Sequence, residues 1–174
     1  MQSSSAASRI QANLQDLFQA NLSSGDTYIR FQLTREINAL LSMKQVQESL
    51  VVDVNNITAL PSMSESVVGI MSSRNRVFCV FDLAQLLGLP SPLSSPRKYQ
   101  VMVLQTTGES PIYVGFAVAR LQGIVRISGD KIQLATKTSE LAPYLHGEAI
   151  VEETAFPILA IDRILKAVTQ LLPN

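Results

Sequence analysis

The stretch that decides the fold runs from Val67 to Leu83 and reads VVGIMSSRNRVFCVFDL. Two apolar segments, Val67–Met71 and Val77–Phe81, flank a polar turn, which is typical of two adjacent β-strands. The second segment is apolar at every position, so both of its faces are expected to be buried. This part of the chain therefore predicts β-structure that packs on two sides.

A short helix is predicted directly after these strands. Asp82 takes the N-cap position, where its carboxylate accepts hydrogen bonds from free backbone N–H groups. Gly88 suits the left-handed conformation that ends a helix, and Pro90 prevents its continuation. Residues 88–98 hold three of the eight prolines, which predicts a surface connector and the main internal boundary.

Alternating or β-branched segments extend the pattern on both sides of this stretch. Strands are predicted from the periodicity over 27–34, 37–42, 49–54, 99–105, 112–118, 123–127, 131–135, 148–151 and 158–161. Segment 123–127 is expected to form a hairpin with 131–135. Amphipathic helices are predicted at both ends, over 4–22 and 162–172. The chain is thus expected to be mainly β.

The second half of the chain repeats the first. The corresponding positions lie 71 to 80 residues apart: Tyr28 and Tyr99, Val46 and Leu121, Gly69 and Gly147, and Asp82 and Asp162. Asp162 is therefore expected to be an N-cap like Asp82. Five strands avoid exposed edges by closing into a small barrel. The repeat predicts an N-terminal helix and linker at 1–24, a first barrel at about 27–88, the connector at 88–98, a second barrel at about 99–161 and a C-terminal helix at 162–172.

Composition excludes several classes of protein. The 14 Lys and Arg residues balance 14 Asp and Glu residues, which argues against a general nucleic-acid binder and against a polybasic membrane anchor. The longest apolar runs are about one strand long, so no direct membrane insertion is expected. One Cys and one His supply neither an internal disulfide nor a usual zinc site, and no metal or cofactor is expected. A lone Cys and the lack of a signal-peptide pattern predict a cytoplasmic protein.

Few residues offer catalytic chemistry. His146 has no Ser or Cys nucleophile at motif spacing, so a loop or core histidine is favoured over a general base. Cys79 lies among apolar neighbours, which favours a buried thiol over a reactive thiolate. Asp82 and Asp162 are better explained as helix caps than as paired catalytic carboxylates. An enzyme or small-ligand protein would require a pocket in which His146 meets a carboxylate, and a binding module is favoured.

The order and spacing of several motifs resemble the CheW-like family. Gly69, Arg74 and Asp82-Leu83 match the family signature Gly-x-x-Asn-x-Arg-Gly, which is followed by a strand and Asp-Leu. Ser72, Asn75 and Cys79 stand where the family has an asparagine, a second glycine and a proline. Upstream, Val46-Gln47-Glu48 resembles the family's Val-Gln-Glu. The similarity extends from about Thr27 to Leu172, which leaves out only the N-terminal helix.

The resemblance implies a fold of two intertwined five-stranded SH3-like barrels with a shared apolar core and no catalytic activity. It implies an adaptor that couples a methyl-accepting chemoreceptor or photoreceptor to a CheA-type histidine kinase. Such an adaptor binds the helical tip of the receptor and docks on the CheW-like regulatory domain of the kinase. By position, the resemblance gives Val46, Glu48, Gly69 and Arg74 as partner-binding residues, and Val68 is a further apolar candidate beside them.

Each of these residues also has a purely structural interpretation. Val46 and Val68 form either an apolar floor for receptor helices or part of the core. Gly69 allows a neighbouring backbone to approach closely, or serves only a strand bend. Arg74 offers a guanidinium fork to a carboxylate or to carbonyls, and Glu48 contributes register at the rim.

A second hypothesis is a regulatory protein of the same fold that binds a response regulator or a pilus or motility component. The predicted N-terminal helix motivates it, because this helix is not part of the minimal family domain.

Overall fold

The structure is a computed structural model that describes residues 10–11, 25–135 and 139–172. The predicted helix over 4–22 lies outside the described residues except for Ile10 and Gln11, which are helical and exposed. The strands are β1 (Asp26–Gln32), β2 (Asn38–Ser42), β3 (Val46–Asp53), β4 (Val67–Ser73), β5 (Arg76–Asp82), β6 (Lys98–Gln105), β7 (Tyr113–Val118), β8 (Arg120–Ile127), β9 (Ile132–Gln133), β10 (Leu145–Val151) and β11 (Thr154–Leu159). The helices are α2 (Leu83–Leu86) and α3 (Ile161–Leu171), with short 3₁₀ turns η1 (Val54–Asn56), η2 (Gly129–Lys131) and η3 (Ala142–Tyr144).

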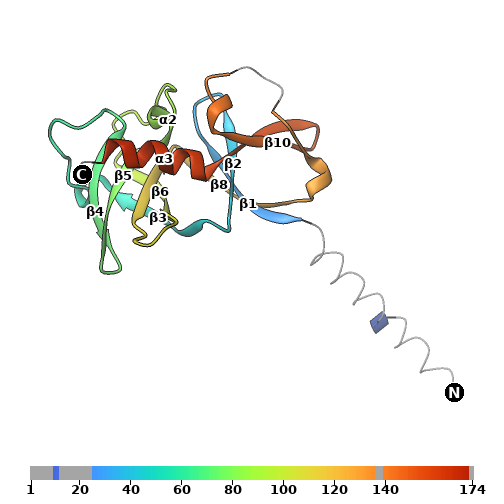
Figure 1. Ribbon diagram of the computed structural model, residues 1–174, viewed down its shortest axis with the longest axis horizontal. Helices are drawn as coiled ribbons and strands as arrows, with labels where there is room; N and C mark the ends of the chain where they lie inside the picture. The colour runs from blue at the N-terminus through green and yellow to red at the C-terminus, as the bar shows by residue number, and fades with distance from the viewer. Residues whose placement is uncertain (1–9, 12–24, 136–138, 173–174) are drawn as a thin grey trace.

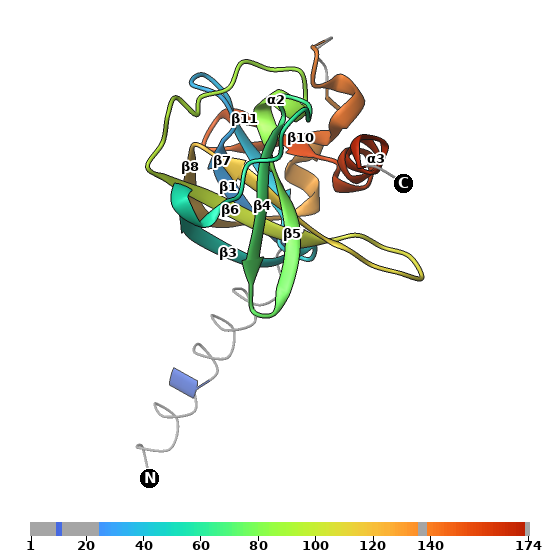
Figure 2. The same ribbon diagram turned by 90° about the vertical axis from the view of Figure 1, so that its left-hand side faces the viewer.

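The strands form two sheets. One has the order β8-β1-β2-β11-β10-β9, and the other has the order β3-β6-β7-β5-β4. In Figure 1 the two sheets lie side by side, and α3 runs from the side of β10 toward β5. Figure 2 shows the five-stranded sheet with β4 and β5 in front and α3 seen end-on beside them. The prediction of a mainly β protein is confirmed.

The predicted internal repeat is visible in the topology. Replacing each strand by its counterpart in the other half turns the order β8-β1-β2-β11-β10 into β3-β6-β7-β5-β4. The bulges follow the same rule: Gln47 in β3 and Gln122 in β8 are skipped at equivalent points, and so are Val68 in β4 and His146 in β10. The two halves therefore share one local plan down to the position of their irregularities.

The division of the chain between the sheets differs from the expected one. The five-stranded sheet takes β3, β4 and β5 from the first half together with β6 and β7 from the second, and the other sheet combines β1 and β2 with β8 to β11. The boundaries at about 27–88 and 99–161 are thus not the boundaries of the sheets. The reason is that the β1–β2 pair and the β6–β7 pair have changed places: β1 and β2 pair with β8 and β11, and β6 and β7 pair with β3 and β5. Strand periodicity shows which face is buried but does not identify the neighbouring strand.

Three apolar clusters form the core. Each sheet curls around a small cluster of its own, and a larger cluster lies between the sheets and under both helices. The side chains of β6 alternate between two of these clusters: Val101 and Val103 face the inside of their sheet, while Met102 and Leu104 face the shared core. This arrangement explains strands that are apolar on both faces. At the start of β5, however, Val77 is 71% exposed, so the predicted burial of that segment holds only from Phe78 onward, with Cys79 half-buried.

Two local predictions at the helix ends have different outcomes. Asp82 is the N-cap of α2, where its carboxylate accepts a hydrogen bond from the backbone N–H of Gln85 at 3.2 Å, and Gly88 has the expected positive φ of 76°. Asp162 is not an N-cap, because Ala160 holds that position in α3. Its carboxylate lies in the first turn and accepts a bond from Gln45 instead. The prediction for Asp162 is therefore wrong.

The predicted hairpin between 123–127 and 131–135 is also wrong. The strand β8 pairs with β1 along its length, and the short strand β9 pairs with β10. Between them, η2 redirects the chain from one edge of the sheet to the other. The Ser128-Gly129-Asp130 sequence thus changes the direction of the chain, but the strands on its two sides are not neighbours in the sheet.

Candidate partner-binding site

Val46 and Glu48 lie at the bulge that begins β3. Val46 pairs with Leu104 and Glu48 with Val103, so Gln47 between them has no partner on β6. Val46 packs partly against the shared core. The side chain of Glu48 is only 9% exposed, although the residue type is usually found in water.

Arg74 lies at the tip of the hairpin that joins β4 to β5. Arg74 and Asn75 both have positive φ angles, 50° and 62°, as in the two-residue turns that best fit twisted strands. Asn75, which stands where the family has a glycine, thus has the left-handed conformation. This turn directs Arg74 toward β3, where its Nε lies 3.3 Å from Oε2 of Glu48. The side chain of Arg74 is 72% exposed.

The ion pair is uneven in its burial. Both carboxylate oxygens of Glu48 are shielded from solvent, and neither accepts a hydrogen bond from the described part of the chain. A carboxylate removed from water is costly unless a cation or hydrogen-bond donors compensate it. Arg74 therefore supplies the compensating charge for Glu48, while most of its guanidinium remains open to a partner.

A groove lies beside Glu48, between strands of the two sheets. Its volume is about 410 Å³, and it is lined by Ile29, Met43, Val46, Gln47, Glu48, Ser49, Leu121, Gly123 and Ile124. Ile124 is 62% exposed, which leaves a large apolar side chain without cover from this part of the protein. Leu121 and Ile124 were not among the predicted site residues. The repeat, which pairs Leu121 with Val46, is the signal that identifies the first of them.

Val68 and Gly69 have surroundings different from those of the groove residues. Val68 is the bulged residue of β4 and packs partly against the inside of the five-stranded sheet. Gly69 is buried, and a Cβ atom there would collide with the carbonyl oxygen of Thr58 and approach Cγ2 of Ile57 to 2.8 Å. Its counterpart Gly147 faces the carbonyl of Gln133 in the same way, at 2.6 Å. The close backbone approach at Gly69 is thus made by the chain itself.

The second half of the chain has the same scaffold without this ion pair. The equivalent of Glu48 in the bulge is Gly123, and the hairpin tip between β10 and β11 carries Glu152 and Glu153, with φ of 49° and 66°. The structure therefore brings Val46, Glu48 and Arg74 together in the first half of the chain, and the equivalent described residues of the second half form no such ion pair. The role of Val46, Glu48 and Arg74 in binding a partner stays a prediction.

An enzyme interpretation requires a pocket in which His146 meets a carboxylate, and His146 does lie in a hollow with two of them. It is exposed and lines an open hollow of about 320 Å³ that also contains Asp26 and Asp162. Both carboxylates are engaged elsewhere: Asp26 pairs with Lys44 at 2.9 Å, and Asp162 accepts a bond from Gln45. Among the described residues, no hydrogen bond orients His146, and no three His, Cys, Asp or Glu side chains gather as metal ligands would. Burial raises the pKa of the Cys79 thiol, which disfavours the reactive thiolate.

The described residues thus combine two curled sheets around a shared core with a charged pair beside an apolar groove. The CheW-like domain family model matches residues 27–169. The chemotaxis protein CheW of Thermotoga maritima is 25% identical over 120 residues, which cover 69% of this chain and 76% of the relative. The crystal structure of the scaffolding protein TtCheW from Thermoanaerobacter tengcongensis has a similar fold, with a TM-score of 0.66 and 18% identity over 78% of this chain and 88% of that chain.

This chain belongs to the CheW-like family. Members of this family are non-catalytic scaffolds of chemotaxis, so the chain is an adaptor rather than an enzyme. Across residues 10–11, 25–135 and 139–172, no helix has the length and apolar character needed to cross a membrane.

Proposed function

We propose that this adaptor couples a methyl-accepting chemoreceptor to a CheA-type histidine kinase. The observation that supports the receptor contact is the groove beside Glu48 and Arg74. Its apolar lining, with Val46 and Ile124, suits the apolar face of an α-helix. The exposed guanidinium of Arg74 suits a carboxylate or a set of carbonyls at a helical tip. Glu48 holds this guanidinium in place.

A separate surface supports the kinase contact. Val77 and Ile112 are exposed, at 71% and 40%, and line one shallow hollow with Cys79 and Leu172. This apolar surface lies on β5 and the start of β7, and shares no residue with the groove beside Glu48. Apolar patches of this kind are typical of protein contacts. We propose that this surface docks on the regulatory domain of the kinase, and that through its partners the adaptor works in the cytoplasm at receptor arrays.

The proposal is tested by reconstituting receptor, kinase and adaptor and measuring receptor-dependent kinase autophosphorylation. Arg74→Glu is expected to abolish control by the receptor while kinase binding in a pulldown is retained. Arg97→Glu makes the same charge change at an exposed position in the connector and is the matched control. Full receptor control with Arg74→Glu, or an equal loss with Arg97→Glu, would contradict the site assignment.

The alternative, a regulatory protein that binds a response regulator or a pilus or motility component, rests on the helix predicted over 4–22. Deletion of residues 1–24 distinguishes the two functions. A change in the proteins that bind supports the alternative, whereas unchanged coupling supports the receptor–kinase adaptor.

A further inference from the structure

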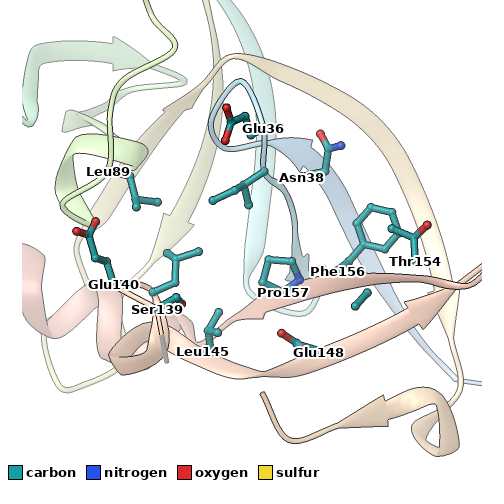
Figure 3. Close-up of a pocket in the computed structure, with 13 residues that line it drawn as sticks. Glu36, Asn38, Leu89, Ser139, Glu140, Leu145, Glu148, Thr154, Phe156 and Pro157 are labelled. Atoms are coloured by element: carbon teal, nitrogen blue, oxygen red, sulfur yellow. The ribbon is translucent and has the colours of Figure 1, made fainter. Parts of the chain in front are cut away.

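A second groove, of about 540 Å³, lies where the β1–β2 turn, the end of the α2 segment and the β10–β11 hairpin meet. It is lined by Glu36, Ile37, Asn38, Leu89, Ser139, Glu140, Leu141, Leu145, Glu148, Thr154, Ala155, Phe156 and Pro157. Figure 3 shows these side chains around one open space. None of them lines the groove beside Glu48.

The floor of this second groove is apolar and firmly supported. Leu141 and Leu145 are members of the shared core, and Ile37 and Leu89 pack against it. Pro157 stands between Leu145 and Phe156 in Figure 3. Because these side chains belong to the packed interior, the floor is preformed, and its open side favours apolar groups from a partner.

The rim of the groove is acidic. Glu36, Glu140 and Glu148 stand at separate points around the space in Figure 3. Among the described residues that line the groove there is no Lys or Arg, and none of the three carboxylates forms an ion pair with this part of the chain. Arg30 lies over the Phe156 ring, 5.8 Å from its centroid, and does not line the groove. The described lining of this groove therefore carries three negative charges, although the net charge of the chain is +0.

We propose that this groove docks a cationic amphipathic segment of a protein partner. Apolar side chains of that segment lie on the floor, and Lys or Arg side chains reach the three glutamates. Burial of the apolar floor supplies affinity. The three carboxylates select a positively charged segment and fix its orientation in the groove. Nucleic acids, anionic lipid surfaces and acidic helices are repelled by the same charges. Because the residues are different, this contact adds to the proposed receptor and kinase contacts and does not replace either.

The test measures binding of a fluorescein-labelled amphipathic peptide of Lys and Leu in heptad spacing, with a Glu and Leu peptide of the same pattern for comparison. The full chain is expected to bind the Lys peptide with an affinity that falls as NaCl is raised, and to bind the Glu peptide at least tenfold more weakly. Glu36→Gln/Glu140→Gln/Glu148→Gln is expected to lose at least tenfold in affinity. The matched control, Glu65→Gln/Glu109→Gln/Asp130→Asn, removes the same charge from exposed positions outside the groove and should bind normally.

A variant that fills the groove without changing the charge distinguishes binding in the groove from non-specific electrostatic attraction of the peptide. Ala155 is exposed and lines the space, so Ala155→Trp is expected to fill it and reduce binding without unfolding the chain, as checked by circular dichroism. Arg74→Glu should bind the Lys peptide normally, which keeps this result independent of the proposed receptor contact. Absence of binding to the wild-type chain, equal loss in the control triple variant, or full binding by Ala155→Trp would each overturn the proposal.

Discussion

The uneven burial of Glu48 and Arg74 predicts an uneven response to mutation. Arg74→Ala leaves the carboxylate of Glu48, 9% exposed and without a hydrogen-bond donor in the described chain, with no compensating charge. Glu48→Met replaces the carboxylate by an apolar side chain of similar size, and the released guanidinium is already 72% exposed to water. The first substitution is therefore expected to destabilise the fold, and the second to change its stability little.

The expected loss of stability in Arg74→Ala lies between the values for fully buried and fully exposed ion pairs. Removing one partner of a fully buried pair costs about 3–5 kcal/mol, and a surface pair contributes about 0–1 kcal/mol. With one partner buried and one exposed, we expect Arg74→Ala to cost about 1–2 kcal/mol, or about 2–8 °C in Tm for a chain of this length. In the Glu48→Met background, the same substitution should cost less than about 0.5 kcal/mol. Arginine and alanine both carry a Cβ atom at the positive φ of position 74. The cost of that backbone conformation is therefore the same in both proteins and does not enter the difference in stability.

The assay is a double-mutant cycle, with urea unfolding of the four proteins followed by far-UV circular dichroism. Equal m-values are required, so that changes in midpoint report stability. A coupling free energy of about 1–2 kcal/mol is expected. If Arg74→Ala costs the same in both backgrounds, to within about 0.3 kcal/mol, Arg74 does not compensate Glu48 and the electrostatic argument fails.

Three further predictions concern the core and the thiol. Gly69→Ala should destabilise by about 1–3 kcal/mol, because its Cβ collides with the Thr58 backbone, whereas Gly129→Ala, with open space around it, should be nearly neutral in the same urea titration. Phe116→Ala should cost about 3–5 kcal/mol and keep a single unfolding transition, because Phe116 belongs to the core shared by both sheets; a new intermediate in calorimetry would contradict this. Alkylation of Cys79 by iodoacetamide should reach half its maximal rate at higher pH in the native chain than in urea, since burial raises the pKa of the thiol. Because the unfolded chain forms the thiolate more readily, this group also lowers stability as the pH rises above about 8.5; an alkylation midpoint at or below that of the unfolded chain would refute the burial argument.

Several features were predictable because they depend on neighbours in sequence. The N-cap at Asp82 and the left-handed residues Asn75 and Gly88 follow from residue type and position. Strand periodicity marked the residues that face a core, and the repeat gave the equivalence of Gly69 and Gly147, which the two bulges confirm. The motif resemblance identified the family that the comparisons establish.

Other features depend on which segments meet in space, and the sequence does not contain that information in local form. The exchange of the β1–β2 and β6–β7 pairs between the halves is decided by strand pairing, and side-chain periodicity does not identify the strand that pairs with a given edge. Asp162 matches Asp82 in the repeat, yet α3 begins at Ile161, two residues before the position equivalent to the start of α2, and leaves Asp162 in the first turn. Val77 belongs to an apolar segment but faces outward, because no strand or helix of the described chain covers the start of β5.

The candidate site combines both kinds of information. The sequence by itself determined the residue types and the polar turn that carries Arg74. The strand predicted from periodicity began at residue 49, so the bulge with Val46 and Glu48 at the start of β3 came from the structure. Only the tertiary structure decided that Glu48 is buried and that Arg74 lies 3.3 Å from it beside an apolar groove between two sheets. The physical reason is that residue type, turn propensity and side-chain periodicity are local, whereas strand pairing, burial and ion pairing depend on how the curled sheets close upon each other.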